Sequence, residues 1–200
     1  MRVLVACEFS GTVRDAFVTK GHDAWSCDIL PTEKPGQHIQ GDALEALKQE
    51  WDLVIAHPPC TYLSYVGSRH WNRPGRAEAR DAALAFMIAL YDAPVEMVAV
   101  ENPVGWANSV WRKPDQIVHP YYFGEPVQKR TCLWLRGLPK LIPTNMLPKP
   151  EPLYFCKGPK SQGKAIHWTE AMRGVSSKDR GKARSKTFQG IADAMAAQWG

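Results

Sequence analysis

The stretch that decides the fold is Trp51-Asp52-Leu53-Val54-Ile55-Ala56, which runs directly into His57-Pro58-Pro59-Cys60. A short run of apolar, β-branched residues is typical of a strand that is buried on both faces of a parallel sheet. Proline has no backbone N–H to donate, so two prolines in succession end the strand. The sequence therefore predicts a buried strand over 51–56 and a rigid exit that presents Cys60.

Similar runs recur on both sides of this strand. Further strands are expected over 3–6, 23–28, 39–42, 97–100 and 131–135. Apolar residues at helical spacing predict helices over 13–20, 43–49, 76–91 and 191–199. Residues 107–127 mix proline, tyrosine and tryptophan and are expected to form loops. Strands that alternate with helices indicate β-α-β units, so the predicted fold class is α/β, a mostly parallel sheet with helices on both faces.

Length and composition fit one ordinary globular domain of 200 residues. No apolar run approaches the length of a membrane span, and Met1–Ala6 is expected to be a first strand rather than a signal peptide. The five cysteines are scattered and form no CxxC pair. A disulfide framework or a metal site is therefore not expected, and a reducing cytoplasm is the natural setting.

The charge is uneven along the chain. Residues 1–100 hold nine Lys/Arg against thirteen Asp/Glu, a net −4, and residues 101–200 hold sixteen against seven, a net +9. A basic half favours an anionic partner, nucleic acid first, although a solvated basic surface has the same composition. Alternating cations close the basic stretch 157–186 and are predicted to contact phosphates: Arg180, Lys182, Arg184 and Lys186.

The predicted strand ends carry residues suited to ligands, which in open α/β sheets bind beyond the carboxyl ends of the strands. These residues are Phe9-Ser10-Gly11, Asp28, Asp42, Pro58-Pro59-Cys60 and Glu101-Asn102. Gly11 would let backbone approach a ligand, Asp28 would accept from ribose hydroxyls, and Asp42 would accept from an amino group. Each also has an ordinary structural interpretation, since a lone Asp after a strand is more often a helix cap and a free cysteine a small buried hydrophobe.

In their order and content these residues resemble the C5-cytosine-specific DNA methyltransferases, in particular the compact phage-encoded type with a reduced or absent target-recognition domain. The matching motifs are Phe9-Ser10-Gly11, Pro58-Pro59-Cys60 with Ser64, Glu101-Asn102, and Gln128-Lys129-Arg130. The resemblance covers roughly residues 1–136, with a weaker match at Phe188-Gln189-Gly190. It implies a Rossmann-like methyltransferase fold, with a catalytic core over 1–136, an irregular basic region over 137–187 and a returning helix over 188–200.

The resemblance also assigns roles. It implies S-adenosylmethionine as cofactor, no metal, and cytosine C5 in DNA as the target, in a modification enzyme of a phage acting in the bacterial host cytoplasm. Cys60 would attack C6, Arg130 would favour its thiolate, and Glu101, protonated or sharing a proton, would hold N3. Residues implied to contact the cofactor are Phe9, Ser10, Gly11, Asp28, Asp42 and Pro58. Residues implied to contact the substrate are Pro59, Ser64, Asn102 and Gln128, with Asn102 also bracing its loop.

Several positions depart from the family pattern. Thr12-Val13-Arg14 replaces the glycine-rich end of the cofactor loop, Thr61 follows the nucleophile where Gln is usual, and Cys132 replaces a second arginine. Alternatives therefore stay open: the same chemistry on a free pyrimidine nucleotide or RNA, transfer of a modified methyl group, or a catalytically silent nucleic-acid-binding homologue. His57 is expected to be structural or to support the site, and its position beside the site leaves a minor role open. Trp106, Trp111 and Trp134 are expected to anchor core or loops, and Cys7, Cys27, Cys132 and Cys156 to be inert.

Overall fold

The computed structural model describes residues 1–159, 162–163, 165–166 and 185–200. The predicted phosphate contacts of Arg180, Lys182 and Arg184 lie outside these residues. A seven-stranded sheet forms the centre, in the order β3-β2-β1-β4-β5-β7-β6. Its strands are β1 (Arg2–Ala6), β2 (Asp23–Asp28), β3 (His38–Gln40), β4 (Leu53–Ala56), β5 (Met97–Pro103), β6 (Gln116–Val118) and β7 (Thr131–Arg136).

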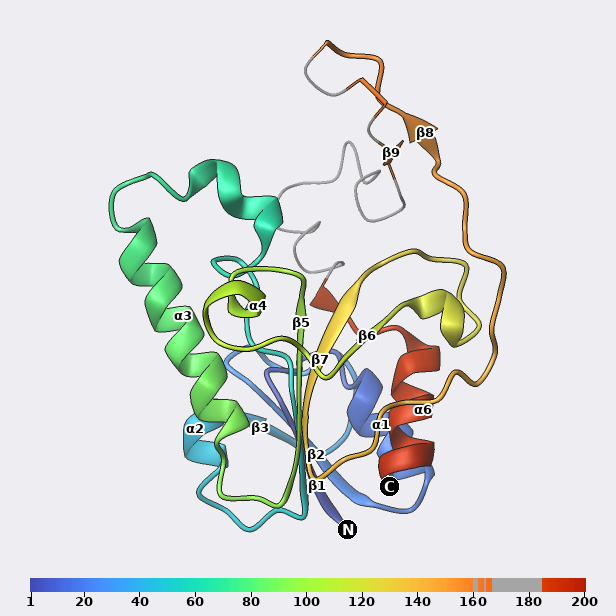
Figure 1. The fold of residues 1–200 in the computed structure, drawn as a ribbon. Coiled ribbons are helices and arrows are strands. Elements are labelled where there is room, and N and C mark those ends of the chain that lie inside the picture. The colour runs from blue at the N-terminus through green and yellow to red at the C-terminus, as the bar shows by residue number, and fades with distance from the viewer. Residues whose placement is uncertain (160–161, 164, 167–184) are drawn as a thin grey trace.

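The first five strands are parallel, and β7 runs antiparallel to both β5 and β6. Helices α1 (Thr12–Thr19) and α6 (Gln189–Trp199) cover one face of the sheet, and α2 (Ala43–Ala46) and α3 (Arg76–Tyr91) cover the other (Figure 1). The predicted fold class, a mostly parallel Rossmann-like sheet with helices on both faces, is confirmed.

The side chains of β1 show how the two layers are separated. Val3 and Val5 are fully buried in the cluster that includes Phe17 of α1 and Met195 of α6. Their neighbour Leu4 points to the other face and joins the cluster of α2 and α3. Successive side chains of a strand alternate between faces, so a continuous apolar run is needed where both faces are covered. This explains why the apolar runs predicted the central strands.

Some elements differ from the sequence expectation. β5 continues through Pro103 because β7 pairs with it, with Glu101 opposite Leu133 and Pro103 opposite Thr131. Residues 107–127 contain three short elements besides loops: α4 (Ala107–Val110), β6 and the 3-10 helix η2 (Pro120–Tyr122). Further short elements are the 3-10 helix η1 (Tyr65–His70) and a hairpin of β8 (Tyr154–Phe155) with β9 (Ala165–Ile166). Among the described helices, none is long and apolar enough to cross a membrane.

The strand order places a switch point at β1. The chain moves outward from β1 to β2 and β3, then returns to the other side of β1 as β4 and continues to β5. Connections on the two sides of β1 therefore diverge, which leaves a crevice outside the carboxyl ends of β1 and β4. The segments that leave β1 and β4 begin at Cys7 and His57, and the candidate site is built there.

Candidate active site

The loop after β1 turns sharply and ends on a carboxylate. Cys7 has a φ of 60°, which is uncommon for a residue other than glycine and redirects the chain out of the strand. The Glu8 side chain, in a residue that is 4% exposed, then accepts hydrogen bonds from the backbone N–H groups of Val13 (2.7 Å) and Arg14 (3.2 Å). Glu8 therefore caps the N-terminus of α1, a role that sequence reasoning missed.

Ser10 and Gly11 also serve this capping turn. The Ser10 hydroxyl donates to Glu8 Oε1 at 3.2 Å. Gly11 has a φ of 69°, and a Cβ built on it would lie 2.5 Å from Nη2 of Arg14. Glycine is thus required for the conformation of this turn and for packing against Arg14, independently of any approach by a ligand.

Arg14 is the residue that replaces the family's glycine-rich ending, and it is fully buried. Its guanidinium donates to the Ser26 hydroxyl at 3.1 Å and to the carbonyl oxygens of Lys34 (3.3 Å) and Pro35 (3.1 Å). It also pairs with Asp15 at 2.8 Å. The departure at Arg14 therefore has a structural function, because it fastens the loop after β2 to the start of α1.

Asp28 and Asp42 lie at the ends of adjacent strands, as predicted. Asp28 Oδ1 accepts from the backbone N–H of Leu30 at 2.9 Å, and Asp42 Oδ1 caps α2 by accepting from Leu44 at 2.8 Å. Burial, followed by the negative charge of Asp28, raises the pKa of Cys7 and brings the pKa of Cys27 to about 11. Both thiols are therefore protonated near neutral pH.

The exit of β4 is held by β5. The Asn102 side-chain amide donates to the Pro58 carbonyl at 2.8 Å, and Asn102 is only 2% exposed. This is the bracing contact that the sequence predicted for Asn102. A turn follows, in which the backbone N–H groups of Leu63 (3.1 Å) and Ser64 (2.9 Å) donate to the Cys60 carbonyl. Cys60 is partly exposed at the head of this turn.

Glu101 lies next to this exit and is paired with His57. His57 Nδ1 lies 3.2 Å from Glu101 Oε2, and the Glu101 side chain is 14% exposed. Burial alone would raise the pKa of Glu101, but the hydrogen bond from His57 and the positive charge of Lys129 outweigh it and hold the pKa below its usual value. The hydrogen bond and the nearby charge therefore favour the carboxylate form of Glu101, and its implied role as a protonated or proton-sharing acid stays a prediction.

The segment that leads into β7 supplies the cation near Glu101. Lys129 is that cation, and its Nζ also lies 5.5 Å from the centre of the Phe188 ring. Arg130, the predicted partner of the thiolate, is exposed. Burial is the main cause that lowers the pKa of His119 and raises the pKa of Cys132, and the positive charge of Arg130 acts to lower both. Gln128 Oε1 is buried, and none of the described residues donates to it. The predicted roles of Arg130 and Gln128 stay predictions.

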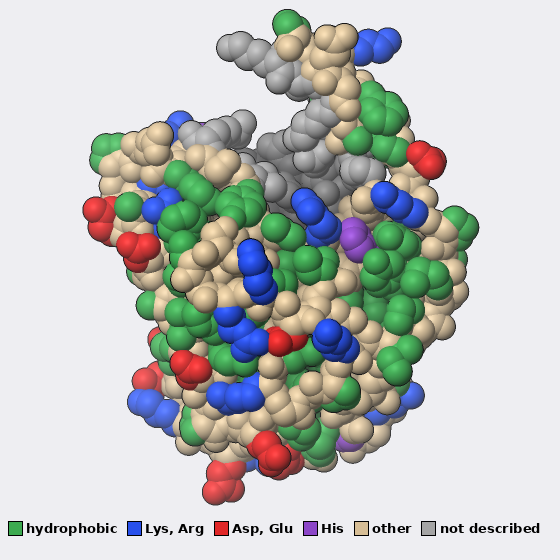
Figure 2. Space-filling model, in the orientation of Figure 1, with side chains coloured by type: hydrophobic (Ala, Val, Ile, Leu, Met, Phe, Trp, Pro, Cys, Tyr) green, Lys and Arg blue, Asp and Glu red, His purple; other side chains and the backbone are tan. Residues whose placement is uncertain are grey.

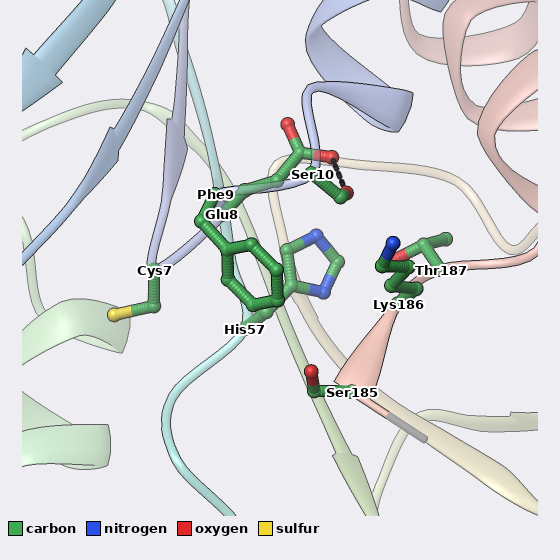
Figure 3. Close-up of a pocket in the computed structure, with 8 residues that line it drawn as sticks. All are labelled: Cys7, Glu8, Phe9, Ser10, His57, Ser185, Lys186 and Thr187. Atoms are coloured by element: carbon green, nitrogen blue, oxygen red, sulfur yellow. Dashed lines mark hydrogen bonds between the residues drawn. The ribbon is translucent and has the colours of Figure 1, made fainter. Parts of the chain in front are cut away.

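A small pocket joins the exits of β1 and β4 (Figure 3). Its volume is about 30 Å³, and its lining consists of Cys7, Glu8, Phe9, Ser10, His57, Ser185, Lys186 and Thr187. Lys186, one of the predicted phosphate contacts, forms an ion pair with Glu33 at 2.5 Å, and its contact with phosphate stays a prediction. A cavity of this size admits one small polar group rather than a whole nucleoside. Within the described part of the chain, no group of three or more His, Cys, Asp or Glu could hold a metal ion.

Beside the turn that follows Cys60, arginines stack on aromatic rings. The Arg76 guanidinium lies 4.3 Å from the centre of the Tyr62 ring, and that of Arg80 lies 5.0 Å from Trp71 and 4.2 Å from Trp106. Trp106 thus contacts a cation as well as anchoring a loop. Arginine over aromatic faces is a combination that nucleic-acid-binding surfaces use. Sequence reasoning missed this cluster because its members are brought together by the packing of η1, α3 and α4.

Among the comparisons with known proteins, the one with solved structures found matches. No protein-family model matches the chain, and no curated protein matches it. A solved structure that is named as a candidate DNA modification methyltransferase, encoded within an E. coli prophage, matches with 14% identity and a TM-score of 0.49. The match covers 74% of this chain and 52% of that one, so this chain spans about half of that protein's length.

Proposed function

We propose that this protein transfers the methyl group of S-adenosylmethionine to C5 of a cytosine in DNA, through a covalent bond between Cys60 and C6 of the ring. The observation that carries this proposal is the juxtaposition of the exits of β4 and β5. Asn102 holds the Pro58 carbonyl at 2.8 Å, and Glu101 pairs with His57 at 3.2 Å. These two contacts hold the segment that leads to Cys60 beside Glu101 of β5, which supports a joint role for the thiol and the carboxylate.

The chemistry needs both groups because C5 of cytosine is a poor nucleophile while the ring is aromatic. Addition of the Cys60 thiolate to C6 breaks the C5–C6 double bond and places electron density on C5, which then takes the methyl group. Loss of the C5 proton and elimination of the thiolate restore the ring. Glu101 would hold the edge that carries N3 and the exocyclic amino group, where negative charge builds on addition and a shared proton stabilises it.

The residues at the β1, β2 and β3 exits fit a cationic nucleoside cofactor. S-adenosylmethionine supplies an electrophilic methyl group on a positively charged sulfur. The helix N-terminus that binds pyrophosphate in dinucleotide-binding sheets needs free backbone N–H groups. Here the carboxylate of Glu8 already accepts from two of them, which disfavours a phosphate and favours a cation. Asp28 and Asp42 each keep a second carboxylate oxygen for ribose hydroxyls or an amino group.

DNA is the proposed substrate because the charges and aromatic rings suit a strand with an exposed base. Lys and Arg side chains spread across the middle of one face of the molecule (Figure 2). The Arg80 guanidinium between Trp71 and Trp106 adds a stacked cation near the turn that Cys60 begins. A base inside a duplex must be flipped out to reach Cys60, and basic and aromatic side chains stabilise the displaced strand.

Tritium transfer from labelled S-adenosylmethionine tests the proposal on four substrates: duplex DNA, single-stranded DNA, RNA and dCMP. We expect transfer to DNA, and a stable adduct with DNA that contains 5-fluorocytosine, in which the C5 fluorine cannot be lost as a proton. Cys60→Ser should lose both signals, whereas Cys156→Ser, a change in a partly exposed thiol outside the site, should keep them. Transfer to dCMP or RNA alone would overturn DNA as the substrate and keep the reaction. No transfer to any of the four would overturn the whole proposal.

A further inference from the structure

His57 stands between the pocket and the proposed base-binding carboxylate. Its backbone N–H donates to the Ala6 carbonyl of β1 at 2.9 Å, so the residue is fixed at the switch point of the sheet. Its side chain is 7% exposed and lines the pocket beside Phe9 and Ser10 on one side and Lys186 on the other (Figure 3). One residue thus lies in the exit of β4, lines the pocket at the exit of β1 and pairs with Glu101 of β5.

The two ring nitrogens of His57 have different partners. A carboxylate only accepts hydrogen bonds, so Nδ1, which lies 3.2 Å from Glu101 Oε2, carries a proton. Nε2 is buried, and no described residue forms a hydrogen bond with it. In the neutral ring with a proton on Nδ1, Nε2 is an acceptor. A buried acceptor without a donor is costly, and it points to a donor group that enters the pocket from a ligand.

We propose that His57 is a positioning residue that couples cofactor binding to Glu101. Its Nε2 accepts a hydrogen bond from one ammonium or hydroxyl group of the cofactor, and its Nδ1–H holds the Glu101 carboxylate in place for the target base. The size of the pocket, about 30 Å³, matches one such group. This inference rests on the proposed function and assigns it a residue that the resemblance to the methyltransferase family did not assign.

Two substitutions of His57 separate the two contacts. The amide of asparagine lies near the Nδ1 position of histidine, so His57→Asn keeps a donor for Glu101 and loses the Nε2 acceptor. The amide of glutamine reaches the Nε2 position, so His57→Gln keeps an acceptor in the pocket and loses the donor to Glu101. Calorimetric titration with S-adenosylhomocysteine measures the first contact without any turnover. The kcat and KM for methyl transfer to DNA measure the second.

We expect His57→Asn to weaken S-adenosylhomocysteine binding by about 3- to 10-fold, the size of one hydrogen bond, with a smaller loss of kcat than in His57→Gln. His57→Gln should bind S-adenosylhomocysteine almost as the parent protein does but lower kcat by about 10- to 100-fold, since a misplaced Glu101 no longer meets the base. Combining His57→Gln with Glu101→Gln should lower kcat no further than the larger single effect, because both changes remove the same contact.

Equal S-adenosylhomocysteine affinity in the parent protein and His57→Asn would overturn the inference and leave the proposed function intact. Equal losses of binding and of kcat in both variants would also overturn it, because they would indicate a general structural role. If the parent protein binds S-adenosylhomocysteine but transfers no methyl group, the proposed function fails, and the affinity of His57→Asn still decides the cofactor contact. A parent protein that does not bind S-adenosylhomocysteine would overturn both.

Discussion

Replacing Arg14 with methionine removes a buried charge, its pair with the partly exposed Asp15 and four further hydrogen-bond donations, while it keeps most of the side-chain volume. The guanidinium donates to the hydroxyls of Ser26 and Thr32 and to the carbonyl oxygens of Lys34 and Pro35. These acceptors lie on β2 and on the loop that follows it. Arg14→Met should therefore destabilise the protein as a whole and release this loop in particular.

The magnitude follows from the acceptors that lose a partner. A hydrogen bond from a charged donor contributes about 1.5–3 kcal/mol, but Lys34 and Pro35 are exposed residues whose carbonyls water can reach. Taking about 1 kcal/mol for each of the four contacts, and subtracting the desolvation cost that a guanidinium no longer incurs, gives a loss of about 3 kcal/mol. For a chain of this length each kcal/mol lowers Tm by about 2–4 °C, so the expected fall is about 6–12 °C.

Urea denaturation and thermal scans measure the global loss, and hydrogen exchange of the loop over residues 29–37 measures the local one. Lys48→Met is the matched control, since Lys48 forms only a surface pair with Glu45 and should change stability by less than about 0.5 kcal/mol. The reasoning is refuted if Arg14→Met is no less stable than Lys48→Met. Global destabilisation without faster exchange in the loop would contradict the fastening role alone.

Three further predictions follow from the same geometry. Because the pKa of Glu101 is lowered in the folded protein, its charge stabilises the fold at neutral pH, and this contribution is lost as the pH falls through that pKa. Glu101→Gln should therefore lower the free energy of unfolding, measured in urea, by about 1 kcal/mol at pH 7 and by less at acid pH. With a pKa of about 11, Cys27 should resist iodoacetamide in the native protein at pH 8, as peptide mass spectrometry would report. A Cβ at Gly190 would lie 2.0 Å from the Phe123 carbonyl oxygen, so Gly190→Ala should lower the unfolding free energy by about 2 kcal/mol, whereas Gly41→Ala, with open space around it, should not.

Elements with a strong local pattern were predictable from the sequence. The helix predicted over 76–91 is α3 with the same bounds, because apolar residues at helical spacing continue without a break from one end to the other. β4 was predictable because all four of its residues, Leu53–Ala56, are apolar and two prolines follow closely. In both segments the local sequence and the packing favour the same structure, so no distant partner has to be known.

Features that depend on distant partners were not predictable. β5 extends past Val100 because β7 pairs with it, and no residue within 97–103 indicates that pairing. The pair of His57 and Glu101 joins residues 44 positions apart, and the sequence favoured a structural role for His57 with only a minor role at the site left open. Glu8 was missed for a different reason. It caps α1 from four positions before the first residue of that helix, and its side chain bridges a turn whose shape depends on the positive φ of Gly11.

The departures from the family pattern fall into two groups, buried positions and an exposed one. Arg14 and Cys132 are both fully buried: Arg14 fastens a loop, and Cys132 packs in the core opposite Asn102 and accepts from the amide of Asn108 at 3.5 Å. Changes at such positions alter the packing beneath the site, and a substrate base cannot reach them. Thr61 differs, because it is exposed and directly follows Cys60. The buried departures are therefore compatible with the proposed thiol chemistry, while the exposed one changes the surface next to Cys60. Methyl transfer to DNA, RNA and dCMP, compared side by side, is for this reason the most informative measurement on this protein.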